Sequence, residues 1–235
     1  MAWFTRRPDE PEQSPRASAQ RADDPSVLDD AAPVAPADEL GRRLVARIVA
    51  ESELPVVDPD AGPSLGAGLC VRAAIDTPDT VDILLTTRLG GWAALGDAAL
   101  AGLRRLPAPA HQRVEHEVHV FESEDHFGAS RLLLHDELLA SVGLTDRPFG
   151  TLVALPTRSS LLVHVLHDAT VVHALHLMSR VARAGQDMPG PLSPHVYYRA
   201  ESGALQQITR YEGDQLQVHV DGAFASAMHD AKLTD

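Results

Sequence analysis

The sequence predicts an α+β fold: a mostly antiparallel sheet packed with about three longer helices, preceded by a disordered N-terminal segment. Strand-like runs follow one another in pairs joined by short turns, and this arrangement favours α+β over a fold in which strands and helices alternate. Longer stretches repeat their apolar residues at helical spacing, as amphipathic helices do. The opening segment is rich in proline and acidic residues and poor in large apolar ones.

We expect residues 1–37 to be the disordered leader, because such a composition cannot bury enough surface to offset the loss of conformational entropy. Trp3 and Phe4 are interpreted as stray aromatics of an unstructured terminus, with a short docking motif as the alternative. Residues 38–235 are expected to form a single domain, or two subdomains that divide near 107–113.

A helix is predicted to open this domain over residues 38–52, with Asp38 as its N-cap and Pro55 as its end. Its large apolar residues fall on one helical stripe: Leu40, Leu44, Val45, Ile48 and Val49. Two strands, 69–75 and 81–87, are then expected to form a hairpin across a short polar turn.

The next helix is predicted to begin near Gly90 and to stop at Pro107, with Trp92 and Leu103 on its apolar face. After this helix, polar and apolar residues alternate, which predicts a strand over 114–121. His116 would lie on the apolar side of that strand, where a buried histidine usually has one satisfied hydrogen bond.

A second strand over 129–134 should pair with this one as a hairpin, and Asp136 should then cap a short helix over 137–143. The next two strands are predicted at 151–155 and 160–166, joined by a Pro-Thr-Arg-Ser turn. A long helix over 169–185 should follow, capped by Asp168 and ended by Gly185. A meander of three strands completes the prediction: 196–200, 204–211 and 215–220.

The net charge of −13 and the isoelectric point near 5.3 make this an acidic chain. Such a chain is repelled by phosphate backbones and anionic lipids, so we expect neither nucleic-acid nor membrane binding. No apolar run approaches the length of a membrane span, and the first residues lack the apolar core of a signal peptide. A cytoplasmic bacterial protein is therefore expected.

No metal and no cofactor are expected. His173 and His176 lie one turn apart on a predicted helix, but Arg180 and Arg183 share their face and would repel a divalent cation. Cys70 is the single cysteine and lies in an apolar run, which favours a buried and unreactive thiol. Motifs of the H-E-x-x-H, C-x-x-C and EF-hand types are absent from the sequence.

No catalytic residues are predicted either. Ser130, Ser159 and Ser160 lie near strands, but none of them is part of a G-x-S-x-G nucleophile elbow. The Gly-Ala-Gly run at 66–68 precedes a strand, whereas a dinucleotide-binding turn follows one. A P-loop pattern is missing as well.

Two arginines are candidates for a binding role: Arg131 inside a predicted apolar strand and Arg158 at a turn between strands. An arginine among apolar neighbours needs a carboxylate or carbonyl partner. The structural interpretation is an internal ion pair. Its candidate carboxylates are Asp136, Asp125 and Glu124. The functional alternative is an anion-binding site formed by these two arginines with His135 and Asp136.

The runs GASRLLLHDELL and GTLVALPTRSSLLVHVL, together with the upstream run TTRLGGWAALGDAALAGLRRL, are similar to the bacterial DUF1444 (YtpQ-like) family. These motifs cover about half of the region that is expected to be ordered. The resemblance implies a fold and a cytoplasmic bacterial setting, and it implies no reaction. The positions that match the family motifs are Arg88, Trp92, Leu103, Ser130, Leu133, Pro156 and Arg158.

The leading functional hypothesis is a non-enzymatic protein that binds or regulates another macromolecule, with a protein as its partner. The second is a domain that binds a small anionic molecule, or a hydrolase, using Arg131, Arg158, His135 and Asp136. The third is an acidic inhibitor of a basic toxin, similar to an immunity protein or an antitoxin, which the negative charge would suit.

Overall fold

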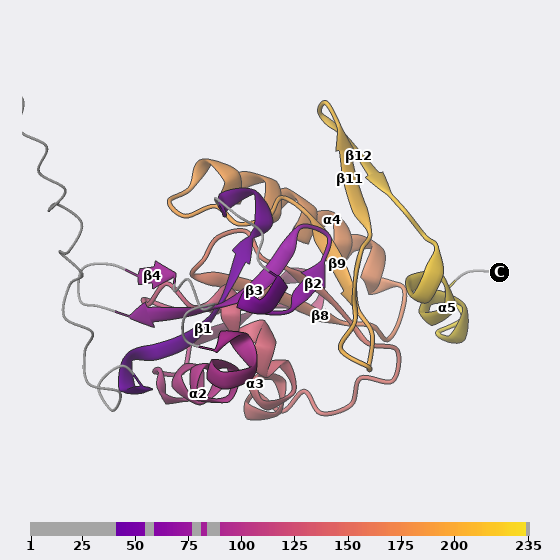
Figure 1. Ribbon diagram of the computed structural model, residues 1–235. Helices are drawn as coiled ribbons and strands as arrows, with labels where there is room; N and C mark the ends of the chain where they lie inside the picture. Colours follow the sequence, from indigo (N-terminus) through magenta and orange to yellow (C-terminus); the bar gives the residue numbers. More distant parts are fainter. Residues whose placement is uncertain (1–40, 55–58, 77–80, 84–89, 234–235) are drawn as a thin grey trace, which may run out of the picture. The chain divides into compact units, whose positions relative to one another are not determined.

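Antiparallel sheets and helices make up the described part of this chain, which confirms the predicted α+β class (Figure 1). The computed structural model describes residues 41–54, 59–76, 81–83 and 90–233, all within one compact unit that spans 36–235. The predicted leader lies outside these residues. So do Asp38, the turn that was expected to join the first hairpin, and Arg88.

A six-stranded antiparallel sheet, here the central sheet, has the strand order β10-β9-β7-β8-β6-β5. Its strands are β5 (Ala110–Arg113), β6 (Val118–Glu122), β7 (Thr151–Ala154), β8 (Ser160–Val165), β9 (Val196–Arg199) and β10 (Leu205–Gln207). The pair β7 and β8 confirms the hairpin predicted across Pro156–Ser159. Nearly all residues of β7 and β8 are buried, on both faces of the sheet, as expected for strands that are covered on two sides.

Alternate residues of the central sheet enter two different cores. Leu152 and Leu162 pack with helix α4 (Thr170–Ala184) and helix α5 (Gly222–Asp230) on one face. Val153 and Val163 pack on the opposite face with the 3-10 helix η5 (Ala129–Leu134) and helix α3 (His135–Ser141). The helix α4 confirms the predicted long helix, and Asp168 accepts a hydrogen bond from the backbone N–H of Thr170 at its start.

A second sheet contains β1 (Leu44–Ala50), β2 (Ser64–Gly66), β3 (Leu69–Asp76) and β4 (Val81–Ile83). The pair β3 and β4 confirms the first predicted hairpin, and α2 (Gly91–Arg105) confirms the helix predicted from Gly90. The helix predicted over 38–52 is wrong, because most of that stretch forms β1, which pairs with β3 along its whole length. Val45, Ile48 and Val49 are β-branched and favour a strand. Both faces of β1 are buried by packing, since Leu44 and Val45 lie in one core with helix α2 and Ile48 lies in another with η5 and α3.

Two further predicted strands are also corrected. The strand expected over 114–121 begins only at Val118, because the backbone turns through a 3-10 helix η4 (Glu115–Glu117) in which His116 has a φ of 57°. His116 is therefore exposed and stacks on His173, instead of lying on a core face. The run 129–134 forms the 3-10 helix η5 and not a strand, and this helix packs against β1 and β8.

The C-terminal part is more elaborate than the expected meander. The strand predicted over 204–211 is split, so that β10 belongs to the central sheet and β11 (Thr209–Glu212) pairs with β12 (Gln215–Val218) as a separate hairpin. This hairpin stands beside α4 in Figure 1, and Tyr211 donates a hydrogen bond to the carbonyl of Ser179. Among the described helices, none has the length and apolar content that a membrane span requires.

Candidate functional site

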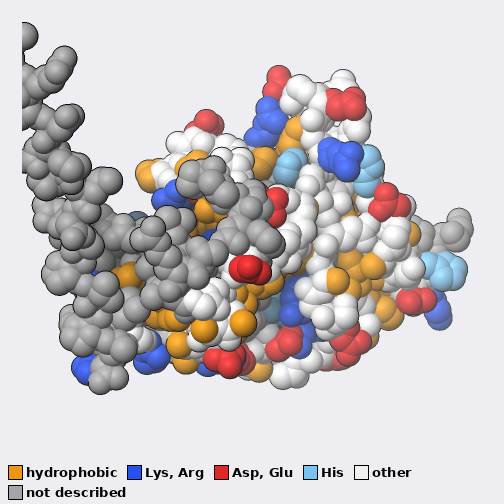
Figure 2. Space-filling view, viewed as in Figure 1, with side chains coloured by type: hydrophobic (Ala, Val, Ile, Leu, Met, Phe, Trp, Pro, Cys, Tyr) orange, Lys and Arg blue, Asp and Glu red, His pale blue; other side chains and the backbone are white. Residues whose placement is uncertain are grey.

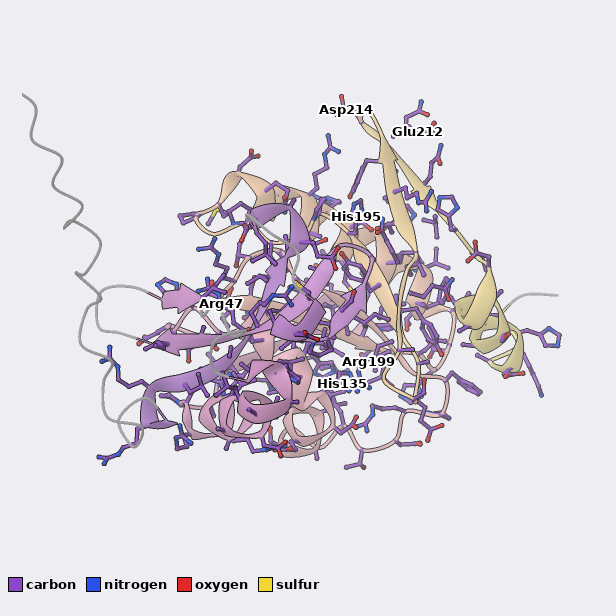
Figure 3. All side chains as sticks on the ribbon, in the orientation of Figure 1. Arg47, His135, His195, Arg199, Glu212 and Asp214 are labelled. Atoms are coloured by element: carbon purple, nitrogen blue, oxygen red, sulfur yellow. The ribbon has the colours of Figure 1, made fainter. Side chains whose placement is uncertain are left out.

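A cavity of about 410 Å³ opens at the end of the central sheet where β7 begins and β9 ends. We refer to it as the β7–β9 cavity. The side chains that matter for its chemistry come from the start of α3, the loop before β7, and the two strands: His135, Asp136, Arg147, Thr151 and Arg199. His135 and Arg199 lie close together below the middle of Figure 3. A cavity of this size suits a small molecule.

Strand pairing brings two of these residues together. Thr151 lies directly opposite Arg199 in the antiparallel pairing of β7 with β9, and Val153 lies opposite Tyr197 two positions further in. Directly paired residues point to the same face of a sheet, and Val153 and Tyr197 belong to the core on the α3 side. Thr151 and Arg199 are therefore carried by the face of the sheet against which α3 starts.

Gly150 sets the close approach of the loop to β9. Its φ is +78°, and an added Cβ would lie 2.6 Å from the carbonyl oxygen of Arg199 and 2.9 Å from the ring of Tyr198. Only glycine adopts this backbone conformation without strain and leaves room for the neighbouring strand. The loop is closed by Arg147, whose guanidinium donates to the carbonyl of Leu144 at 2.7 Å.

A chain of hydrogen bonds runs from a carboxylate to a hydroxyl through one imidazole. His135 Nδ1 is 3.1 Å from Asp136 Oδ1, and its Nε2 is 3.1 Å from Thr151 Oγ1. A proton on Nδ1 would be donated to the carboxylate, and the threonine hydroxyl would then donate to Nε2. His135 is buried, whereas Asp136 extends toward solvent.

Burial lowers the pKa of His135 from its ordinary value of 6.5 to about 4, and the positive charge of Arg199 adds to this effect. The hydrogen bond and negative charge of Asp136 oppose the shift without cancelling it. The same hydrogen bond, together with the two nearby arginines, lowers the pKa of Asp136. Near neutral pH the interacting group of His135, Asp136 and the two arginines thus consists of a neutral imidazole, an ionised carboxylate and two cations.

The two arginines differ in how well they are paired. Arg147 Nη2 donates to Asp136 Oδ1 at 3.0 Å. The Arg199 side chain is only 16% exposed, yet its Nη1 lies 3.7 Å from the same oxygen, which is beyond hydrogen-bond distance. Within the described residues, the Arg199 guanidinium makes no hydrogen bond. Burial lowers the pKa of Arg199, although Asp136 acts in the opposite direction.

Of the four residues proposed from the sequence, the structure brings two together in this cavity, His135 and Asp136. Arg131 is elsewhere: it is buried in an ion pair with Asp125 at 3.0 Å and donates to the carbonyl of Pro107 at 2.7 Å. The ion-pair interpretation with Asp125 therefore describes Arg131. Arg158 is partly exposed, and its Nη2 lies 3.3 Å from Glu53 Oε2.

The other sequence candidates hold structural positions. Ser130 accepts a hydrogen bond from the backbone N–H of Ile48 at 3.0 Å, so its hydroxyl joins η5 to β1. Cys70 is buried, as expected. His173 and His176 are both exposed on α4. In the parts of the chain that the structure describes, no group of three or more histidine, cysteine or acidic residues is placed to hold a metal ion.

Sequence reasoning missed Thr151, Arg147 and Arg199. One signal for Arg199 was present: in the run VYYR, alternation places this arginine on the same face as Tyr197. An arginine on a core face of a strand requires an explanation, as it did for Arg131. Arg147 offered no such signal, because it lies in a loop and its partner is eleven residues away.

Comparisons of this chain with protein-family models, with curated proteins and with solved structures found no match.

Proposed function

We propose that this protein binds a small oxyanionic molecule, a carboxylate or a phosphate, in the β7–β9 cavity. The observation that carries the proposal is Arg199, a largely buried cation on the cavity wall without a hydrogen-bond acceptor in the described chain. Guanidinium groups recognise carboxylate and phosphate oxygens through paired hydrogen bonds. A bound oxyanion would provide the acceptors that Asp136 is too distant to provide.

Binding is favoured over hydrolysis at this site because of the state of His135. The chain of Asp136, His135 and Thr151 has the order of a hydrolase triad. A general base works best when its pKa lies near the working pH, whereas the pKa of His135 is about 4. Thr151 is also almost fully buried. Positioning of the cavity wall is a better role for these hydrogen bonds than proton transfer.

A thermal-shift screen tests this proposal. Carboxylic acids, inorganic phosphate and amino acids would each be added to the wild-type protein, with sodium chloride as the ionic-strength control. We expect at least one oxyanion to raise the melting temperature, as any ligand specific to the folded state does. The rise should disappear in Arg199→Gln and persist in Arg158→Gln, which removes an arginine outside the cavity.

Either of two results would reject oxyanion binding in this cavity. The first is a flat screen with the wild-type protein. The second is a ligand whose effect survives Arg199→Gln undiminished. Loss of the effect in Arg158→Gln alone would instead place the site at the turn between β7 and β8, where the sequence first suggested it.

Binding of a protein partner is the second candidate, and a groove between α4 and the β11–β12 hairpin favours it. Val181 and Val218 line this groove and are 37% and 39% exposed. Exposed apolar side chains that gather in one hollow are typical of interaction surfaces. Capture of a stoichiometric protein by the wild type, and its loss in Val218→Asp, would support this candidate. Equal capture by both proteins would reject the groove.

A cytoplasmic setting and membership of the DUF1444 (YtpQ-like) family are part of the same proposal, and both rest on the sequence alone. The inhibitor hypothesis rests on the net charge of −13. Co-purification with a basic protein encoded by a neighbouring gene would favour that hypothesis over a small ligand.

A further inference from the structure

The charges that line the β7–β9 cavity are of both signs. Two guanidinium groups, of Arg147 and Arg199, face three carboxylates, of Asp136, Asp146 and Glu201. Arg147 is paired with Asp136 by a hydrogen bond of 3.0 Å. On the face drawn in Figure 2, acidic and basic side chains are likewise interspersed, with no large area of a single sign.

Beyond the hydrogen-bonded pair of Arg147 and Asp136, the lining holds one cation, which forms only a long ion pair with Asp136, and two further anions. Arg199 has no hydrogen bond within the described residues. Asp146 and Glu201 are exposed, and neither forms an ion pair with another described residue. Asp146 belongs to the loop before β7, and Glu201 to the turn after β9. Arg199, whose one ion pair is the long contact with Asp136 at 3.7 Å, therefore borders the same space as two carboxylates that have no ion-pair partner among the described residues.

We propose that the ligand of this cavity is zwitterionic, an amino acid or the end of a short peptide, with its carboxylate at Arg199 and its ammonium group at Asp146 and Glu201. This inference rests on the proposed oxyanion site and narrows it to one chemical class. Opposite charges within a few ångströms attract, and they do so more strongly in a partly enclosed site than in open water.

Ligands with only one charge fit the lining less well. A dianion would place a second negative charge beside a lining in which carboxylates already outnumber guanidinium groups. A simple amine would be attracted by Asp146 and Glu201, but it would leave the Arg199 guanidinium without an acceptor. A zwitterion satisfies both sets of groups and adds no net charge.

The test compares ligands that share one skeleton. Leucine, 4-methylpentanoate and 3-methylbutylamine present the zwitterion, the carboxylate alone and the amine alone, and equivalent trios extend the set to other amino acids and to dipeptides. Affinities are measured by calorimetry on the full chain. We expect one zwitterion to bind at least about tenfold more tightly than its carboxylate and amine counterparts, a difference of about 1.4 kcal/mol.

Variants then locate the ammonium group. The double variant Asp146→Asn, Glu201→Gln should weaken binding of the zwitterion about tenfold and should not weaken binding of the matching carboxylate, because it removes only negative charges from the lining. Glu212→Gln, which removes an exposed carboxylate from the β11–β12 hairpin, should change neither affinity. Equal melting temperatures without ligand establish that the variants are folded.

The outcomes separate this inference from the function on which it rests. A carboxylate that binds as tightly as its zwitterion, in an Arg199-dependent manner, would overturn the zwitterion and keep the oxyanion site. Unchanged zwitterion affinity in the double variant would also overturn it. If no ligand in the set binds, the inference is rejected, and the proposed function is rejected for carboxylates and stands only if phosphate binds in the thermal-shift screen.

Discussion

Arg199 and Thr151 are directly paired across β9 and β7, so a cation and a hydroxyl that are 48 positions apart in sequence share one edge of a cavity. The pairing fixes both backbones, and it places both residues on the sheet face against which α3 begins. His135 then connects them, because its Nε2 is hydrogen-bonded to Thr151 and its pKa responds to the charge of Arg199. Four of the five side chains that carry the chemistry of the cavity thus lie on regular elements, whose geometry is stiffer than that of loops.

Gly150→Ala should disrupt this geometry. The new Cβ would meet the backbone of β9 at 2.6 Å and would be held at a φ of +78°. Backbone strain and overpacking together should lower the free energy of unfolding by about 3 kcal/mol. Gly143→Ala is the matched control, since its φ is +82° but nothing lies within 4 Å of the added Cβ.

Gly143→Ala should therefore lower the free energy of unfolding by the backbone strain alone, about 1 kcal/mol. Chemical denaturation of both variants measures the difference. Equal losses of stability would contradict the close packing of Gly150 against β9.

His135 should make the protein less stable as the pH falls. Its pKa is about 4 when folded and 6.5 when unfolded, so between these values the unfolded chain binds a proton that the folded chain does not. The contribution of neutral His135 to the free energy of unfolding is complete above pH 6.5 and is lost as the pH falls through about 4. It amounts to at most about 3 kcal/mol.

His135→Gln keeps an amide near Thr151 but does not titrate, so its stability should depend less on pH across this window. Three other histidines also have lowered pKa values: His119, His164 and His195. They are present in both proteins, so the difference between the two stability profiles isolates the effect of His135. His176→Gln, at an exposed position, should leave the profile unchanged. Parallel profiles for wild type and His135→Gln would show that His135 titrates normally.

Asp125→Asn should destabilise the protein without affecting the cavity. It would leave the Arg131 guanidinium, whose side chain is 6% exposed, without its carboxylate. Loss of one partner of a buried ion pair costs about 3 kcal/mol. Glu137→Gln removes the partner of Arg104 in a pair that is half exposed, and this should cost less than about 1 kcal/mol.

Urea denaturation measures both effects. A loss at Asp125→Asn no larger than that at Glu137→Gln would contradict a structural role for this ion pair. A loss of oxyanion binding in folded Asp125→Asn would return Arg131 to the functional site.

Thr151→Val should remove the hydrogen bond to His135 at nearly constant volume. The buried Nε2 would then lack a partner, which should lower the free energy of unfolding by about 2 kcal/mol. Thr151→Ser keeps the hydroxyl and should restore most of this loss. If Thr151 positions the cavity and does not react, both variants should still bind the ligand of the wild type, as calorimetry can establish.

Much of the architecture followed from local pattern. The strands β7 and β8 and the helices α2 and α4 combine a clear period with turn or capping residues at their ends. The helix predicted around β1 was wrong because Leu44, Val45, Ile48 and Val49 fit a helical stripe, while the strand is set by pairing with β3, in which the residue opposite each of them lies more than twenty positions away. In this segment, pairing with β3 outweighed the helical spacing of the apolar residues.

The site was harder to predict than the fold. His135 and Asp136 are adjacent in sequence, and both were proposed. Arg147 and Arg199 reach them only through the loop before β7 and the strand order β9-β7. That order depends on long-range pairing, which the period of a single strand does not encode. Arg131 and Arg158 had the right chemistry, but the fold carries them to other partners.

The most direct test of the account is an NMR titration of the Arg199 guanidinium, with its Nε–Hε signal assigned by its absence in Arg199→Gln. Addition of the best oxyanion from the screen should shift this signal saturably, with the affinity found by calorimetry, and should leave the Arg158 signal in place. A ligand that binds while the Arg199 signal stays unchanged would contradict the proposal that this cation is the oxyanion site.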